Sequence, residues 1–311
     1  MKLPHTPPAK LHYAFLPNGL EHPKFRRYEG GHSAYILCHK ATIQHVKDRG
    51  TYKRFSPDGG TTTMHPLVAQ QIGHILRVRV LQELQLLARR LLRIRRSAEP
   101  GEPPLLRRLT RGEWSKIKAT GVIPFKNAVA VLVVPPLNKD PQTKMHPTPA
   151  TTSAPITEDV ELKDLPRSLP ISVLHPTSDE ERLWKDHPLS KLTPPSLVPL
   201  YNGVSLFPSR TQRAALHAAI SKVLKAERTT RLMTSSQLAL SEEATSTSGG
   251  PKRAKGDKKA SHAVLVCSDE RTILRADTAP LAIALWRVRM WEGGLDEAAT
   301  VDWMADPPRT A

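Results

Sequence analysis

The amino-acid sequence predicts an α/β protein: a small mixed sheet with packed helices, one long basic helix, extended arms and disordered insertions. Short apolar runs rich in β-favouring residues occur at 128–134, 204–207 and 263–267, which is typical of buried strands. Apolar residues recur with a helical period from Pro66 onward. The chain has 29 prolines, nearly twice the usual share of ~5%, which indicates much irregular backbone. An α+β arrangement is the alternative.

Residues 1–31 are expected to form an extended arm, because proline and glycine punctuate them and no period of a strand or helix persists. The next apolar run, Ala34 to Cys38, predicts a first strand. A loop over 56–63 with two adjacent glycines follows. Whether this region forms a hairpin is left open.

The most regular pattern predicts a long helix over 66–96, within a basic α/β segment that spans 32–134. Proline is tolerated at a helix start, because its missing N–H would have no partner there. Apolar residues recur along the helix at Val68, Ile72, Ile75, Leu76, Val80, Leu84, Leu87 and Leu91. At 1.5 Å per residue the helix is roughly 45 Å long. This length predicts either a kink near Gly73 or a projecting end.

The unbroken apolar run at 128–134 closes this segment, after a short helical turn around 114–118. Seven residues with much β-branching favour a strand that is covered on both faces. A buried helix is the alternative. Residues 135–200 are dense in Pro, Ser and Thr and collect acids, so we expect a Pro-rich acidic linker there.

Residues 201–294 are predicted to form a second α/β segment, followed by a tail at 295–311. Its strand at 204–207 leads into a helix, on which most basic residues lie off the apolar stripe: Arg210, Arg213, Lys222, Lys225 and Arg228. Residues 229–260 lack periodicity, which predicts a disordered insertion. The strand at 263–267 then precedes a helix that Asp277 caps and that two glycines end.

The charge balance predicts a polyanionic partner. The chain has 46 Lys and Arg against 29 Asp and Glu, a net charge of +17 and a pI of about 10.1. Such a field attracts nucleic acid, because counterions released on binding favour association. A merely soluble basic protein is the alternative. Two cysteines without a CxxC pair favour a reducing compartment, and no apolar stretch approaches the ~20 residues of a membrane span.

The candidate RNA-binding residues concentrate on the long helix and directly after it. Arginine presents a planar fork of donors that suits phosphate oxygens and stacks on unpaired bases. Between residues 77 and 96 the only acid is Glu83, so pairing within the helix cannot neutralise this face. A solvated face paired with more distant acids is the alternative. The predicted set here is Arg77, Arg79, Arg89, Arg90, Arg93, Arg95, Arg96, Arg107, Arg108, Arg111, Lys116 and Lys118.

A second basic cluster lies among glycines and serines near residue 255. It contributes Lys252, Arg253 and Lys255 to the predicted RNA-binding set, and Lys258 and Lys259 follow. The same cluster is also typical of a nuclear import signal or of a solvated linker.

No catalytic, metal or cofactor site is predicted. The sequence has no GxSxG, GxxxxGK[ST] or HExxH motif and no GxGxxG after a strand. The side chains nearest to a metal set, without zinc spacing, are His32, Cys38, His39 and His45. Four tryptophans are able to stack bases but are more typical of core or interface anchors: Trp114, Trp286, Trp291 and Trp303. We therefore predict no enzyme, no cofactor and no small-molecule substrate.

The Pro-rich arm, Arg-rich helices, small α/β elements and low-complexity insertions together resemble the accessory proteins of fungal mitochondrial ribosomes, in composition and organisation. The resemblance implies a structural role in the mitochondrial matrix, with rRNA and neighbouring ribosomal proteins as partners. We therefore expect a structural constituent of a ribonucleoprotein. Two other hypotheses stay open: a nuclear DNA- or chromatin-binding regulator, and an RNA-modifying enzyme or ribosome assembly factor.

Overall fold

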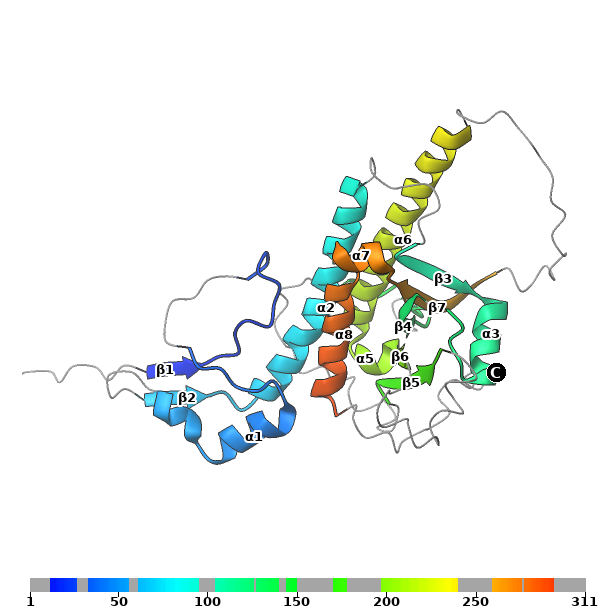
Figure 1. Ribbon diagram of the computed structural model, residues 1–311. Coiled ribbons are helices and arrows are strands. Elements are labelled where there is room, and N and C mark those ends of the chain that lie inside the picture. Colours follow the sequence, from blue (N-terminus) through cyan, green and yellow to red (C-terminus); the bar gives the residue numbers. More distant parts are fainter. Residues whose placement is uncertain are drawn as a thin grey trace, which may run out of the picture.

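The computed structural model describes residues 12–26, 33–55, 61–94, 104–125, 127–139, 144–149, 170–177, 197–239, 259–275 and 277–293. Within them a five-stranded mixed sheet carries helices on both faces (Figure 1), which confirms the predicted α/β class. The strands lie in the order β3-β7-β4-β6-β5. Their bounds are Leu106–Thr110 (β3), Ala128–Val133 (β4), Ser172–Pro176 (β5), Leu197–Asn202 (β6) and Ala260–Cys267 (β7).

Three helices cover one face of this sheet: α2, Val68–Ile94; α6, Arg210–Ala239; and α8, Ala279–Trp291. Helix α2 packs against both α6 and α8, and their apolar side chains share one core with the sheet. It confirms the long helix predicted over 66–96. Helix α3, Arg111–Thr120, covers the opposite face with Ile117 and contains the turn predicted at 114–118.

The central strand β4 is buried on both faces, as predicted for the run 128–134. Its Ala130 and Leu132 side chains join the core under α2, α6 and α8, whereas Val131 joins the core under α3. Strand β7 lies antiparallel on one side of it and β6 lies parallel on the other. A strand enclosed in this way tolerates apolar residues at every position, which explains the unbroken run.

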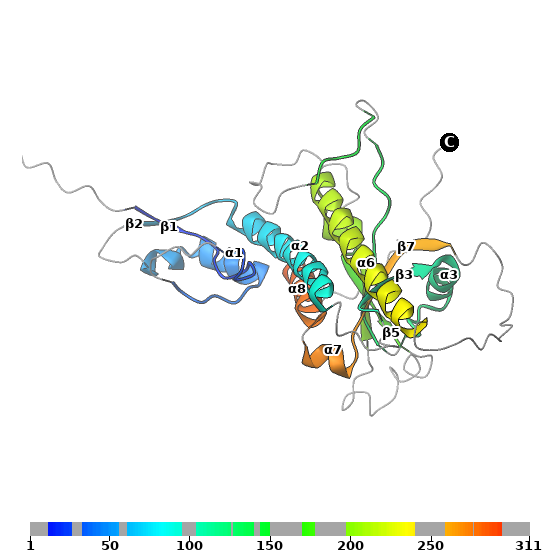
Figure 2. The ribbon, with the colours of Figure 1, turned by 90° about the horizontal axis from the view of Figure 1, so that it is seen from above.

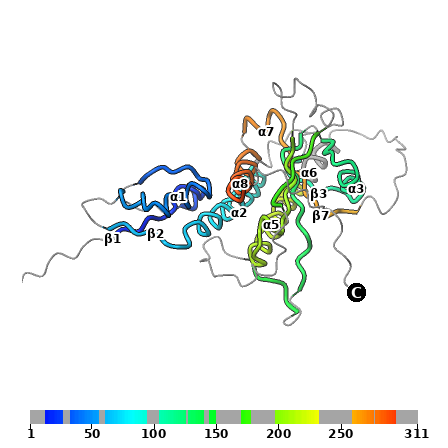
Figure 3. Tube along the Cα trace, turned by 90° about the horizontal axis from the view of Figure 1, so that it is seen from below, coloured from blue at the N-terminus to red at the C-terminus, as the bar shows by residue number. Residues whose placement is uncertain are grey.

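The N-terminal residues form a smaller unit beside the first turns of α2 (Figures 1 and 3). In it β1 pairs in parallel with β2, so the predicted arm contains a strand. The strand predicted at 34–38 is wrong, because this segment is irregular and packs Ile36 against the main core. The bounds in this unit are His12–Phe15 (β1), Lys40–Asp48 (α1), Thr51–Phe55 (the 3-10 helix η1) and Thr61–Met64 (β2).

The strand predicted at 204–207 is also wrong. Strand β6 ends just before it, and the chain turns into a short helix, α5, Gly203–Leu206. The side chain of Asn202 caps this helix by accepting a backbone hydrogen bond at 3.0 Å. A Cβ at Gly203 would lie 2.5 Å from the carbonyl oxygen of Val133 on β4. Glycine therefore allows the close approach at which the strand ends.

Two segments predicted to be irregular contain regular structure. The linker predicted at 135–200 includes β5 and most of β6. Helix α6 continues to Ala239, into the insertion predicted at 229–260. Thr230 is buried there, and its hydroxyl donates to the carbonyl of Ala226 at 3.0 Å, so this polar group is satisfied inside the helix. The rest of that insertion up to residue 258 and the tail lie outside the described residues.

The helix cap predicted at Asp277 is wrong as well. Helix α8 begins after Thr278, whose side chain makes no capping hydrogen bond. Asp277 is buried and contacts arginine side chains instead. A further short helix, α7, Glu270–Leu274, precedes α8 in the chain and is capped by Asp269.

Arg77 belongs to the interior of the protein. Its Nε donates to the carbonyl of Leu206 at 2.7 Å, its Nη1 donates to the carbonyl of Gly73 at 3.0 Å, and its Nη2 pairs with Glu292 at 2.7 Å. Helix α2 continues through Gly73 without a break, and a Cβ there would lie 3.1 Å from the indole nitrogen of Trp291. Arg77 therefore ties α2 to α5 and to the end of α8.

Replacing Arg77 by alanine is expected to lower the free energy of unfolding by about 2–4 kcal/mol, because a buried carbonyl and a partly buried carboxylate lose their donor. Urea unfolding followed by circular dichroism measures this change. The matched control is Arg89→Ala at an exposed position of the same helix, with an expected change below about 0.5 kcal/mol. Equal losses in the two variants would contradict the interior role of Arg77.

Candidate nucleic-acid interface

The second half of α6 carries four exposed basic side chains that make no ion pair with any described residue. They recur every three residues along about 14 Å of helix axis, and because each step shifts the position by about 60° around the helix, they wind half-way round it from Lys222 to Arg231. They are Lys222, Lys225, Arg228 and Arg231. The RNA-binding set predicted from the sequence leaves all four out. Lys222, Lys225 and Arg228 are already expected from the sequence to lie off the apolar stripe of this helix, and this separation is the signal that would have placed them in the set.

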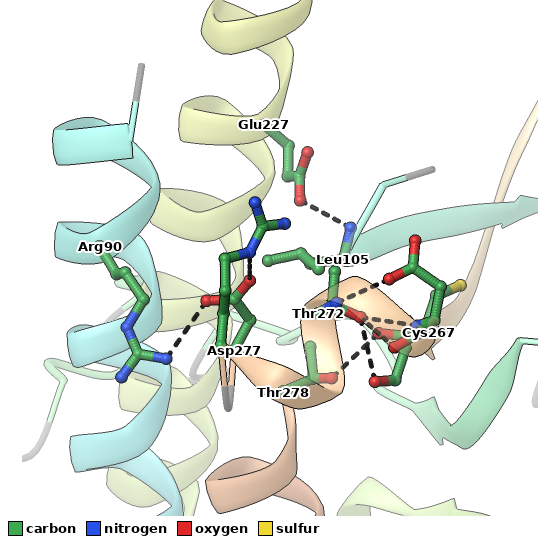
Figure 4. Close-up of polar contacts among 10 residues, drawn as sticks. Arg90, Leu105, Glu227, Cys267, Thr272, Asp277 and Thr278 are labelled. Atoms are coloured by element: carbon green, nitrogen blue, oxygen red, sulfur yellow. Dashed lines mark hydrogen bonds and ion pairs between the residues drawn. The ribbon is translucent and has the colours of Figure 1, made fainter. Parts of the chain in front are cut away.

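The acid that lies among these four residues points inward. Glu227 is buried, and its carboxylate accepts a hydrogen bond from the N–H of Leu105 at 2.8 Å, just before β3 (Figure 4). The carboxylate therefore satisfies the backbone that leads into the edge strand. Within residues 210–231 the sequence has no other acid, so the neighbouring Arg228 receives no counter-charge from its own part of the helix.

Arg108 on β3 extends this positive surface beyond α6. Strand β3 contacts α6, and Arg108 is exposed and makes no ion pair within the described part of the chain. The positive charge of Arg108 lowers the pKa of His217 on α6. Arg108 and the four basic residues of α6 together are named the basic ridge here.

His217 lies beside Arg108 and is held neutral. Its ring Nε2 lies 2.7 Å from the carbonyl oxygen of Pro135, so the ring donates from Nε2. Partial burial lowers the pKa of His217 most. The hydrogen bond to Pro135 raises this pKa and the charges of Arg108 and His262 lower it, so the net pKa lies below its usual value.

The arginines predicted on the long helix have different environments. Arg89 and Arg93 are exposed and make no ion pair with a described residue. Arg79 pairs with Glu83 one turn away at 2.7 Å, and Arg77 is interior. The predicted residues outside the described ranges are Arg95, Arg96, Lys252, Arg253 and Lys255.

Arg90 takes part in an ion-pair cluster that joins α2 to the turn between α7 and α8 (Figure 4). The side chain of Asp277 is 1% exposed and accepts from Arg90 at 3.4 Å and from Arg275 at 3.1 Å. The backbone N–H of Asp277 donates to the carbonyl of Thr272 at 3.0 Å. The guanidinium of Arg90 therefore stabilises the packing of α2 against this turn, in addition to adding positive charge at the surface.

The predicted basic residues beyond β3 lie on α3. Arg111 and Lys116 are exposed and make no ion pair with a described residue, and Lys118 is half-buried. Helix α3 covers the sheet face opposite to α6, so these charges are separate from the basic ridge.

Arg107 is held against the sheet face that α3 covers. Its guanidinium pairs with Glu113 at 3.1 Å and lies 4.8 Å from the ring centre of Phe125. Glu113 also accepts from the N–H of Thr110 at 2.8 Å and so caps α3. Partial burial raises the pKa of Glu113, but the hydrogen bonds from Arg107 and Thr110 outweigh it, so the pKa lies below its usual value. Arg107 therefore stabilises the start of α3.

No family model, no curated protein and no solved structure matches this chain. In the described ranges no helix combines the length and the apolar character needed to pass through a bilayer. The described residues also contain no group of three or more His, Cys, Asp or Glu that is arranged to hold a metal ion.

The lowered pKa of His217 predicts a loss of stability in acid. Below the unfolded pKa near 6.5, the unfolded chain takes up a proton that the folded chain resists. Stability is therefore full above about pH 6.5 and falls as the pH drops toward the folded pKa. His217→Gln, which keeps a donor for Pro135, is expected to flatten the change in urea midpoint between about pH 7 and pH 5. The control is His45→Gln at an exposed position, and equal profiles for the two variants would contradict the prediction.

Asp277→Asn is expected to loosen α7, because Arg90 and Arg275 lose their shared carboxylate. The expected loss of stability is about 1–3 kcal/mol, and hydrogen exchange of the amides at 270–274 should become faster. The control is Asp48→Asn on the exposed side of α1. Unchanged exchange at α7 would show that the carboxylate does not hold this turn.

Proposed function

We propose that this protein is a structural, RNA-binding component of a ribonucleoprotein, and that the particle is the mitochondrial ribosome with rRNA as the ligand. The observation that carries the proposal is the basic ridge, five exposed positive side chains whose neighbouring acid, Glu227, is used inside the fold. Mixed surfaces normally intersperse charges of both signs. An unneutralised stripe instead binds phosphates, and the released counterions favour binding.

The ridge is held on a rigid support. The inner side of α6 packs against α2 and the sheet, with Leu216 and Val223 fully buried. The stretch of helix from which the basic side chains project is therefore held in place before any ligand binds. Such preorganisation lowers the entropy cost of association.

The positive groups lie on several elements that reach one end of the molecule. Helices α2 and α6 run side by side in the same direction (Figures 1 and 2), so Arg93 on α2 and Arg231 on α6 lie toward the same end. Strand β3 contributes Arg108 next to α6, whereas the charges of α3 lie on the other face of the sheet. Phosphates at irregular positions, as in a folded RNA, fit such a surface better than one straight duplex groove does.

The resemblance in composition and organisation to accessory proteins of fungal mitochondrial ribosomes supports the ribosome as the particle and the mitochondrial matrix as the location. A nuclear DNA-binding regulator is the alternative, since DNA phosphates respond to the same charges. An RNA-modifying enzyme or assembly factor would bind the same RNA only transiently.

Charge reversal on the ridge is expected to weaken RNA binding without unfolding the protein. The variant is Lys225→Glu with Arg228→Glu and Arg231→Glu, and the probe is a transcribed fragment of mitochondrial rRNA. Affinity at moderate salt should fall by roughly a hundredfold, and the slope of log affinity against log salt should decrease by about two for three lost phosphate contacts. Helicity by circular dichroism should stay unchanged, because all three side chains are exposed.

The matched control reverses three exposed basic residues of the N-terminal unit, Arg49, Lys53 and Arg54. It changes the net charge by the same amount at a distance from the ridge. Its affinity for RNA should stay within about threefold of the unaltered protein once salt screens long-range attraction. Equal weakening by both triple variants would show that total charge, and not the ridge, binds RNA.

Affinity purification of the tagged full chain at about 150 mM salt tests the particle itself, because electrostatic binding weakens steeply with salt. Mitochondrial rRNA and ribosomal proteins are expected to copurify and to sediment together with one ribosomal subunit. Recovery of no RNA would contradict the proposal. Nuclear localisation of the tagged protein would favour the DNA-binding alternative, and association with subunit precursors alone would favour an assembly factor.

A further inference from the structure

Helix α8 is apolar on its solvent-facing side as well as on its buried side. Leu285 and Val288 are buried in the core between α8 and α2. On the outer side Ile283 is 54% exposed and Trp286 is 40% exposed. A helix at the surface of a globular protein normally presents polar residues outward. The outer side of α8 therefore has the composition of a helix side that packs against another apolar surface.

Helix α7, which precedes α8, also exposes apolar side chains. These two helices follow each other closely in the chain and lie next to each other in the structure (Figure 1). On α7 the side chains of Ile273 and Leu274 are 58% and 87% exposed. The fold of the chain therefore does not bury these two apolar side chains.

The irregular segment that precedes α1 exposes a further apolar side chain. This segment runs beside the second half of α8, because Lys40 pairs with Glu292 at 3.6 Å and the thiol of Cys38 lies within the electrostatic reach of Arg287. Figure 3 shows the N-terminal unit next to α8. Leu37 in this segment is 73% exposed. The surface made by Leu37, Ile273, Leu274, Ile283, Trp286 and Arg287 is named the apolar face here.

On α8 the exposed charged group beside Ile283 and Trp286 is Arg287. Arg287 is exposed and makes no ion pair with any described residue. It lies one turn after Ile283, on the same side of α8. A partner that covers the aliphatic side chains would bury this guanidinium, so it must supply a carboxylate opposite Arg287.

We propose that the apolar face is the docking site for a neighbouring protein, which binds through an amphipathic helix whose apolar stripe is flanked by Asp or Glu. Large contiguous apolar patches are rare on monomeric proteins and mark interaction sites. The proposal goes beyond RNA binding and does not depend on it, since the basic ridge lies on other elements.

Two other occupants fit the apolar face less well. RNA bases would stack on Trp286, but the aliphatic side chains of Ile273, Leu274 and Ile283 offer no stacking surface and lose water only to apolar groups. A second copy of the chain, paired about a two-fold axis through the face, would bring the two Arg287 side chains toward each other. This pairing would place like charges together in a poorly solvated contact.

Site-specific photocrosslinking tests the proposal. The full chain carries a photoreactive phenylalanine derivative at position 283 and replaces the natural copy in the cells that make it. Irradiation is expected to give a nuclease-resistant crosslink to a different protein, at a helical segment with Asp or Glu beside apolar residues. Adding Arg287→Glu should reduce the crosslink by about tenfold, because like charges then oppose each other. The same probe at exposed Met145 is the control and should give no such crosslink.

Each other outcome overturns the proposal: an adduct with RNA, a crosslink between two copies of the chain, equal yields at positions 283 and 145, or a yield that Arg287→Glu does not change. Circular dichroism of both altered chains checks the fold, which should be intact because the altered side chains are exposed. RNA that copurifies with the Arg287→Glu chain is measured in parallel. Loss of the crosslink with RNA retained separates this proposal from the proposed function.

Discussion

Burial of β4 on both faces is the constraint on which the rest of the structure depends. Each fully buried side chain such as Leu132 or Val131 contributes about 1.5–3 kcal/mol relative to exposure, and these two point in opposite directions. No single element covers both. Helices α2, α6 and α8 cover one face and α3 covers the other, so segments from Val68 to Trp291 converge on one six-residue strand.

The covering helices also decide where the charges lie. A buried donor without an acceptor costs free energy, so acids near the interior are drawn to such donors. Glu227 accepts from a backbone N–H next to β3, Asp277 holds two arginines, and Glu292 pairs with Arg77. Each of these carboxylates therefore has its partner inside the fold and does not offset positive charge at the surface. The positive surface of α6 therefore results from segregation of charge by the fold, as well as from the excess of basic residues in the composition.

The basic ridge and the apolar face act through different physics. The ridge attracts phosphates over about a Debye length and weakens as salt rises. The apolar face acts only on contact and depends on the removal of water from aliphatic groups. The two lie on different elements, the ridge on α6 and β3 and the apolar face mainly on α7 and α8. A component that contacts RNA with one surface and a protein with another would need this separation, because each partner then leaves the other surface free.

The sequence by itself determined the α/β class, the long helix near 66–96 and the strands near 128–134 and 263–267, because helical and strand periods are local properties of the chain. Tertiary structure alone decided that the apolar run at 204–207 forms a turn of helix, since Gly203 has to pass close to β4. It also decided which arginines face solvent. Arg77 and Arg89 look alike in the sequence, and what separates them is an acid 215 positions away from Arg77, brought next to it by the packing of α8 on α2. Side-chain availability depends on such long-range contacts, which no local pattern records.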